Sequence, residues 1–300
     1  KDQLRFFYCI LSLIVPFLFY LNLKIKFNNM DKNLLLIFAS VLFILPTFRY
    51  TAIWANNQMT ALIFLLISTF FFLKWFEEKK GKINLNLILQ ILFMTLAVYT
   101  RQDYIIFFLY FMIVYIQKIK FKEFLALSIF VSLLTLPGFW FIYQNPHTIT
   151  QVKFTYEFQN FLLVNSSIMS LYLIPIFFCL IINNIDDFKK EIKFFVISSI
   201  FFTVLVYIFS YSFYYNYILG GGFMMKLSLL LFNNYFLFYI SSILGFIFLT
   251  YLAKGNINDL IIILLLLFGY FASMVFQKYF EPLFIFIFFL LLQSRLSNEF

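Results

Sequence analysis

The stretch MTALIFLLISTFFFLKWF (59–76), followed at once by EEKKGK (77–82), decides the fold class of this chain. The first part is a nearly unbroken apolar run of the length that crosses a bilayer as a helix, about 17–25 residues. Its apolar residues are continuous rather than alternating, which predicts a helix and not a strand. The second part is a short, lysine-rich connection of the kind found on the cytoplasmic side of membrane proteins.

The same pattern continues along the whole chain, which is 64% hydrophobic and 12% charged. Soluble domains contain about 45–50% apolar and about 25% charged residues, so the composition excludes a soluble enzyme, a disordered chain and a conventional nucleic-acid-binding protein. We predict an all-α, polytopic transmembrane helical bundle that forms one domain over residues 1–300. About eleven spans are expected, at 6–23, 34–46, 59–76, 83–99, 104–117, 124–143, 161–182, 194–212, 235–253, 260–276 and 283–293.

The positive charges predict which loops face the cytoplasm. The net charge is +9, and alternating spans place most of the 22 Lys and Arg residues in one set of loops, such as 77–82 and 186–193. Lysine and arginine excess marks the cytoplasmic side. The protein is then a multi-pass protein of a bacterial plasma membrane or of the endoplasmic reticulum. Residues 1–5 would start outside without a signal peptide, so we expect one more span and an outer loop upstream of Lys1.

The outer segment PTFRYTAIWANNQ (46–58) carries Arg49 among aromatic residues, including Tyr50 and Trp54. One interpretation is an interfacial anchor, because Trp, Tyr and Arg are common at the level of the lipid headgroups. The other is the wall of a pocket in which the planar guanidinium of Arg49 binds a phosphate. The sequence leaves both interpretations open.

The segment YTRQDY (99–104) joins two apolar runs with almost no loop. Arg101, Gln102 and Asp103 are therefore expected at the membrane surface or just below it, with Tyr104 beginning the next span. Charges near the hydrocarbon are costly and tend to be paired or functional. Arg101 and Asp103 either neutralise each other or belong to a binding site.

The segment FQKYFEP (276–282) precedes the last apolar run and contains Lys278 and Glu281, which are three residues apart. On a helix, residues at this spacing share a face and can form an ion pair. In the structural interpretation, Glu281 caps the start of the last helix. In the functional interpretation, Lys278 contacts a phosphate, and Glu281 holds a sugar hydroxyl or Arg49.

Other polar features point less clearly to chemistry. Gly220, Gly221 and Gly222 lie near Lys226 and form a turn, a lid or a backbone phosphate site. His147 is the sole histidine. It has no cysteine nearby, so we expect no metal site. Asp186 and Asp187 lie beside lysines in a loop of the cytoplasmic set. Cys9 and Cys179 each lie inside an apolar run, as expected for free thiols, and Asn165-Ser166-Ser167 matches a glycosylation acceptor.

The order of these outer segments resembles the polytopic glycosyltransferases of the GT-C superfamily, and most nearly the dolichyl-phosphate-glucose α-1,2-glucosyltransferases and their bacterial relatives. FRYTAIWANN (48–57), YTRQDY (99–104) and QKYFEP (277–282) carry the resemblance. It implies a polyprenyl-phosphate sugar as donor, a glycan or lipid-linked acceptor, and inverting transfer on the outer face without a further cofactor. It also implies that the general-base aspartate lies in the first outer loop, upstream of Lys1.

Three hypotheses remain at this stage: a membrane glycosyltransferase, a flippase or polymerase for lipid-linked polysaccharide repeats, and a non-catalytic membrane subunit. In the first, the cations bind the lipid phosphate, Asp103 and Glu281 orient them, and the aromatic residues and Gln102 line the sugar site. Three structural expectations follow. Arg101 contacts Asp103 or Glu281. Arg49 or Lys278 faces the same cavity without a carboxylate partner. The spans starting at 59, 104 and 283 begin side by side.

Overall fold

The computed structural model describes residues 2–54, 56–78, 81–145, 158–183, 185–208, 220–269 and 277–293. Within these ranges the chain forms helices joined by turns, with no strand, which confirms the all-α class. The chain packs as two compact units. Residues 1–152 with 286–290 form the first unit, and residues 153–285 with 291–300 form the second. The single domain expected over residues 1–300 stays a prediction.

The first unit carries the segments 46–58 and 99–104. In chain order its elements are α1 (Asp2–Ser12), α2 (Ile14–Lys26), α3 (Lys32–Ser40), the 3-10 helix η1 (Val41–Ile44), α4 (Pro46–Ile53), α5 (Asn57–Glu77), α6 (Leu85–Thr100), the 3-10 helix η2 (Gln102–Tyr104), α7 (Ile105–Lys118) and α8 (Phe121–Gln144).

Local capping fixes where the helices around these segments begin. The Asn56 side chain accepts a hydrogen bond from the Gln58 amide (3.1 Å) and starts α5. The Asn84 side chain accepts one from the Leu87 amide (3.0 Å) and starts α6. Such caps satisfy amide groups that lack a partner in the first helical turn. Pro46 occupies the first turn of α4, where a missing amide hydrogen costs nothing.

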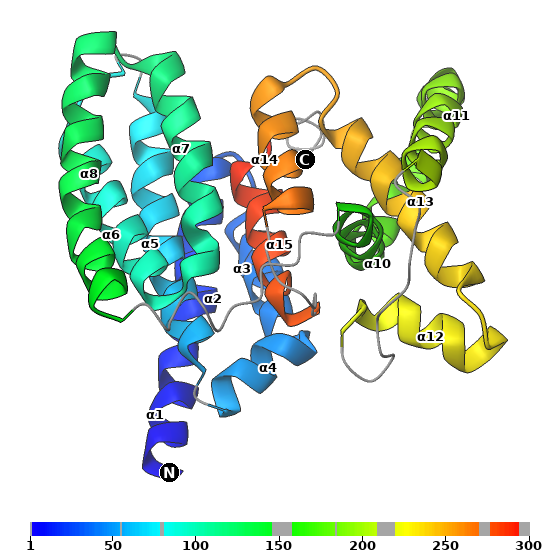
Figure 1. Ribbon diagram of the computed structural model, residues 1–300, viewed down its shortest axis with the longest axis horizontal. Coiled ribbons are helices and arrows are strands. Elements are labelled where there is room, and N and C mark those ends of the chain that lie inside the picture. The colour runs from blue at the N-terminus through cyan, green and yellow to red at the C-terminus, as the bar shows by residue number, and fades with distance from the viewer. Residues whose placement is uncertain are drawn as a thin grey trace. The chain divides into compact units, whose positions relative to one another are not determined.

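A fully buried polar network connects three helices of the first unit. α5, α6, α7 and α8 lie side by side (Figure 1). Ser68 on α5 donates to the Gln90 carbonyl (3.0 Å) on α6, and Gln90 Nε2 donates back to the Ser68 hydroxyl (3.2 Å). The Tyr115 hydroxyl on α7 donates to Gln90 Oε1. Interhelical hydrogen bonds between apolar surfaces specify how membrane helices associate.

The second unit carries the segments around Gly220 and Glu281. Its elements are α10 (Phe158–Asn183), α11 (Ile185–Ile208), α12 (Gly222–Phe232), α13 (Phe236–Leu252), α14 (Ile257–Phe268) and the 3-10 helix η3 (Gln277–Tyr279). α15 (Leu283–Phe286) and the π-helical stretch η4 (Ile287–Leu291) follow, with residues 286–290 assigned to the first unit.

Small residues bring α10 and α13 into close contact. A Cβ atom at Gly245 would lie 1.9 Å from the Ser166 carbonyl oxygen, so only glycine fits there. The Ser167 and Ser241 hydroxyls are hydrogen bonded across the interface (2.8 Å). Small residues spaced by one turn allow this approach between membrane helices. Asn165 is fully buried and donates to the Leu267 carbonyl (2.8 Å), so the Asn-Ser-Ser sequence lies inside the helical packing.

Four helical segments are long and apolar enough to span a bilayer, or five when one bent pair counts as a span. They are Asp2–Lys26, Asn57–Glu77, Phe121–Phe141 and Lys189–Ile208, with the bent pair Lys32–Ile44 and Pro46–Ile53. These helices indicate a membrane protein. The described residues thus contain fewer long spans than the eleven expected, because several apolar runs form helices of 10–17 residues, among them Leu85–Thr100 and Ile257–Phe268.

Two of the shortest expected spans differ most from the prediction. The run 34–46 changes from α-helix to 3-10 helix at Val41 and bends by 67° into α4 at Pro46. Proline disfavours helical geometry in the residue before it, and Leu45 is extended (ψ 121°). The run 283–293 forms a single α-helical turn and a π-helical stretch whose side chains are mostly buried in the protein.

Some sequence predictions fall outside the described residues. They concern His147 and parts of the expected spans, at 209–212 and 270–276. The side chains of Asp186, Asp187 and Cys179 are also outside the described part of the chain.

Candidate functional site

Arg101 lies at the point where α6 ends. Its amide still donates to the Ala97 carbonyl (2.9 Å), but its backbone is extended (φ −149°, ψ 107°), and η2 begins at the next residue. This one-residue connection turns the chain directly into η2 and α7. The Arg101, Gln102 and Asp103 side chains are therefore held at the end of the helical bundle, as the absence of a loop predicted.

Arg101 and Asp103 form an ion pair in which two guanidinium nitrogens donate to one carboxylate oxygen. Arg101 Nε is 3.0 Å and Nη2 is 2.9 Å from Asp103 Oδ2. The Arg101 side chain is only 11% exposed, whereas that of Asp103 is 42% exposed. The pair confirms the expectation that Arg101 contacts Asp103, and it leaves the carboxylate within reach of solvent.

The Tyr104 ring lies beside this pair. The guanidinium carbon of Arg101 is 5.9 Å from the ring centroid, within the range of a cation–π contact. Tyr104 is 1% exposed, and its buried hydroxyl has no hydrogen-bond partner among the described residues. A buried hydroxyl without a partner is costly. Gln102, the third polar member of the segment, is exposed.

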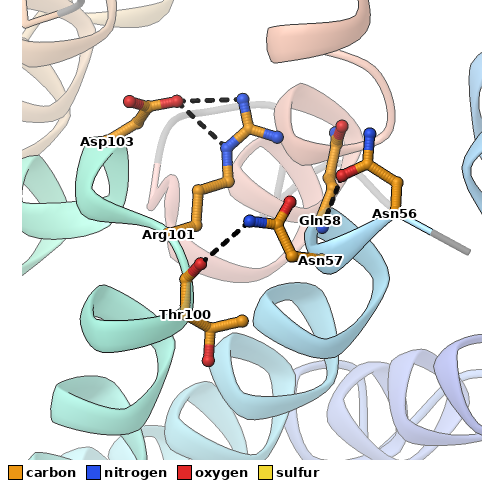
Figure 2. A network of polar contacts seen from close by, with 6 residues as sticks. All are labelled: Asn56, Asn57, Gln58, Thr100, Arg101 and Asp103. Atoms are coloured by element: carbon orange, nitrogen blue, oxygen red, sulfur yellow. Dashed lines mark hydrogen bonds and ion pairs between the residues drawn. The ribbon is translucent and has the colours of Figure 1, made fainter. Parts of the chain in front are cut away.

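The start of α5 adds a row of amide side chains to the pair. Figure 2 shows Asn56, Asn57 and Gln58 beside Arg101. Asn57 Nδ2 donates to the Thr100 carbonyl (3.3 Å), which ties the start of α5 to the end of α6. The span expected at 59 therefore begins beside the end of α6, whereas its juxtaposition with the span expected at 104 stays a prediction. The sequence predicted that these amide side chains lie near the membrane surface, but nothing in it predicted the contact between Asn57 and Thr100.

Arg49 and Tyr50 lie on α4, Trp54 follows its last residue, and all three are exposed. The Tyr50 and Trp54 rings are one helical turn apart, with centroids separated by 6.0 Å. The Arg5 guanidinium of α1 lies 4.7 Å from the Trp54 ring centroid. Arg5 is a contact that the sequence analysis missed, because nothing local links two residues on separate helices.

In the second unit, Glu281 is 2% exposed and belongs to a hydrogen-bonded cluster. It accepts a hydrogen bond from the Tyr172 hydroxyl of α10 (2.7 Å) and a longer one from Gln277 Nε2 (3.4 Å). Gln277 Nε2 also donates to the Tyr172 hydroxyl (3.0 Å), and its Oε1 accepts from the Phe223 amide (3.1 Å) at the start of α12. Tyr172 and Gln277 are site residues that the sequence analysis did not find.

Lys278 is half-buried within η3, and this helix ends at Tyr279. Glu281 lies in the following turn, so the two residues do not share the continuous helical face that their spacing suggested. The glycines at 220–222 all have positive φ angles and lead into α12. A Cβ at Gly222 would lie 2.6 Å from Ile168 Cγ1. This packing supports the turn interpretation of the glycine cluster. Lys226 is exposed on α12.

The predicted site residues thus fall into two groups. Arg101, Asp103 and Tyr104 are in contact in the first unit, where Arg49, Tyr50 and Trp54 also lie. Lys278 and Glu281 belong to the second unit. The shared cavity for Arg49, Arg101 and Lys278, and the juxtaposition of residue 283 with the other span starts, stay predictions.

The chemistry available at the first group is the binding of an anion with hydroxyl or phosphate oxygens. It offers a shielded guanidinium, a carboxylate that orients it, a buried phenol and amide side chains. Within the described residues, no group of three His, Cys, Asp or Glu side chains could hold a metal ion. Comparison with protein-family models, curated proteins and solved structures finds no match for this chain.

Proposed function

We propose that the protein is an integral membrane glycosyltransferase of the GT-C type, which transfers a sugar from a polyprenyl-phosphate sugar to a glycan or lipid-linked acceptor on the outer face of the membrane. The observation that carries this proposal is the Arg101–Asp103 pair at the end of α6, with its Arg101 side chain 11% exposed and its guanidinium 5.9 Å from the centroid of the buried Tyr104 ring. Its place at the edge of an apolar helical bundle suits a substrate whose lipid tail stays in the bilayer.

The proposed reaction is an inverting displacement. The acceptor hydroxyl oxygen bonds to the anomeric carbon of the sugar as the bond from this carbon to the phosphate oxygen breaks. The lipid phosphate leaves with the electron pair, and the acceptor proton passes to a carboxylate base. The resemblance described above implies that this base is an aspartate.

In this scheme Arg101 stabilises the negative charge that grows on the leaving phosphate. Oriented cations in a site with little water are effective because they need no reorganisation during the reaction. Asp103 is a positioning residue that fixes the plane of the guanidinium. Arg49 supplies further positive charge, and Gln102 and Tyr104 contact the donor. Tyr50 and Trp54 offer aromatic faces to the sugar.

Sugar transfer tests the proposal. Membranes from cells that express the full-length gene are incubated with radiolabelled polyprenyl-phosphate glucose, and label in the acceptor fraction is counted. Arg101→Ala should lower transfer by at least about a hundredfold, in the range for removal of one transition-state donor. Lys24→Ala, an exposed cation elsewhere in the first unit, is the matched control and should leave transfer unchanged. Wild-type turnover with Arg101→Ala would disprove the assignment.

A further inference from the structure

A second charged surface lies in the first unit, where the connection between α5 and α6 packs against the end of α7. A Cβ atom at Gly81 would lie 2.2 Å from the Lys118 carbonyl oxygen, so the two backbones are in direct contact. The Trp75 indole donates to the Lys82 carbonyl (3.0 Å) and fixes the connection from inside. Two lysine-rich connections that are far apart in sequence are therefore held together.

This surface, which we call the lysine face, consists of five exposed lysines. They are Lys74, Lys82, Lys118, Lys120 and Lys122. The carboxylates near them are Glu77, Glu78 and Glu123. Glu78 is occupied by the side-chain amides of Asn84 (2.6 Å) and Asn86 (3.1 Å). The described residues of the face therefore carry more positive than negative charge.

Lys118 is held against the end of α5. Its Nζ donates to the Phe76 carbonyl at the end of α5 (3.0 Å) and lies 3.1 Å from the centroid of the Phe76 ring. Desolvation by the surrounding protein lowers the pKa of Lys118 below that of an ordinary lysine. An anion beside it would compensate for the lost hydration and favour the charged form.

Apolar side chains continue directly from the lysine face. Ile116 is 58% exposed, Phe121 is 77% exposed and Leu125 is 54% exposed. They are interspersed with the lysines in sequence and lead onto α8, whose apolar segment Phe121–Phe141 faces largely outward from the protein. A ligand here meets positive charge at one end and a hydrocarbon surface at the other.

We propose that the lysine face binds the headgroup of an anionic phospholipid, whose acyl chains lie along Phe121, Leu125 and the outward surface of α8. Basic residues at the ends of membrane helices attract anionic headgroups. The apolar surface that adjoins the lysines favours a lipid over a soluble anion or a nucleic acid. This site is independent of the proposed transferase activity, because it lies at the other end of α6 from Arg101.

Lipid exchange measured by native mass spectrometry tests this site. The whole protein, purified in nanodiscs of phosphatidylcholine, is titrated with phosphatidylglycerol, and retained lipids are counted after release into the gas phase. The test variant combines Lys82→Gln, Lys120→Gln and Lys122→Gln. The control combines Lys24→Gln, Lys32→Gln and Lys193→Gln, which removes the same charge from exposed lysines on α2, α3 and α11. Thermal unfolding in neutral nanodiscs identifies any variant that fails to fold.

The wild type should retain phosphatidylglycerol in preference to phosphatidylcholine. The test variant should bind it at least about tenfold more weakly, since each lysine near a surface contributes about 1 kcal/mol. The control should keep wild-type affinity. Equal losses in both variants would mean general charge attraction, and retention in the test variant would place the lipid elsewhere. Displacement by millimolar inorganic phosphate would show a free-anion site. Each of these three results overturns the proposal.

Discussion

Arg101 and Asp103 are two residues apart. The Arg101 guanidinium donates to a single carboxylate oxygen of Asp103 through Nε (3.0 Å) and Nη2 (2.9 Å). The spacing is possible because Arg101 leaves helical geometry and η2 starts immediately after it. The pair places one shielded cation and one half-exposed anion at the edge of the first unit. The contribution of the pair to stability can therefore be measured separately from its contribution to function.

Asp103→Asn should change stability little and function strongly. Ion pairs with a partner open to solvent are worth about 0–1 kcal/mol, so we expect the free energy of unfolding to fall by less than about 1 kcal/mol. Sugar transfer should fall by at least about tenfold, because the guanidinium loses its orientation. Thermal unfolding in nanodiscs and the transfer assay measure the two effects. A stability loss of several kcal/mol that accounts for the lost activity would make the pair structural.

Gly81→Ala should destabilise the first unit. Gly81 has φ +46°, and an added Cβ would lie 2.2 Å from the Lys118 backbone oxygen, which has no side-chain freedom with which to move away. Strain and overlap together should cost about 2–4 kcal/mol. Gly255→Ala is the matched control, since Gly255 has φ +87° but open space around it. It should cost about 1 kcal/mol from backbone strain alone. Equal melting temperatures for the two variants would contradict the close contact.

The Ser68–Gln90–Tyr115 network should show energetic coupling. Gln90→Leu and Tyr115→Phe should each lower the free energy of unfolding by about 1 kcal/mol, the usual value for a hydrogen bond between membrane helices. Together they should cost less than the sum, because the second change removes a group that the first has already left unpaired. Thr95→Val is the control, as Thr95 bonds only to the Ile91 carbonyl of its own helix (2.9 Å). Strict additivity in a double-mutant cycle would contradict the network.

Gln102 and Lys82 should be labelled from opposite sides of the membrane. Both are exposed, and α6 lies between them. In a background without Cys9 and Cys179, Gln102→Cys should react with an impermeant maleimide in intact cells, and Lys82→Cys only after permeabilisation. The charge distribution gives this orientation. The opposite labelling pattern would place Arg101 at the cytoplasmic face and invert the proposed topology.

The sequence predicted those structural features that depend on neighbouring residues. Continuous apolar runs predicted helices, and the missing loop before Tyr104 predicted that Arg101 and Asp103 lie together at a helix end. The prediction of a continuous span at 34–46 was wrong, because Pro46 forces Leu45 out of helical geometry and bends the chain. A hydropathy pattern reports apolar composition, whereas the length of a helix depends on such breaks and on caps.

Contacts between distant segments were not predictable in the same way. The bond from Tyr172 to Glu281 joins residues 109 positions apart, and no periodicity of either segment encodes it. Tyr172 lies in an apolar helix, where a single tyrosine does not indicate a polar site. Likewise, Arg5 covers Trp54 only because α1 packs against α4. These contacts depend on tertiary packing. Tertiary packing is determined by the whole chain together and not by any one segment.

The most direct measurement of the central claim is equilibrium binding of a polyprenyl phosphate to the purified full-length protein in phosphatidylcholine nanodiscs. Arg101→Ala should weaken binding by about 10- to 100-fold, as expected for a lost charge-assisted hydrogen bond of about 1.5–3 kcal/mol. The variant with Lys82→Gln, Lys120→Gln and Lys122→Gln should bind like the wild type, since it leaves this end of α6 intact. Unchanged affinity in Arg101→Ala would show that the lipid phosphate does not bind at the Arg101–Asp103 pair and would contradict the account.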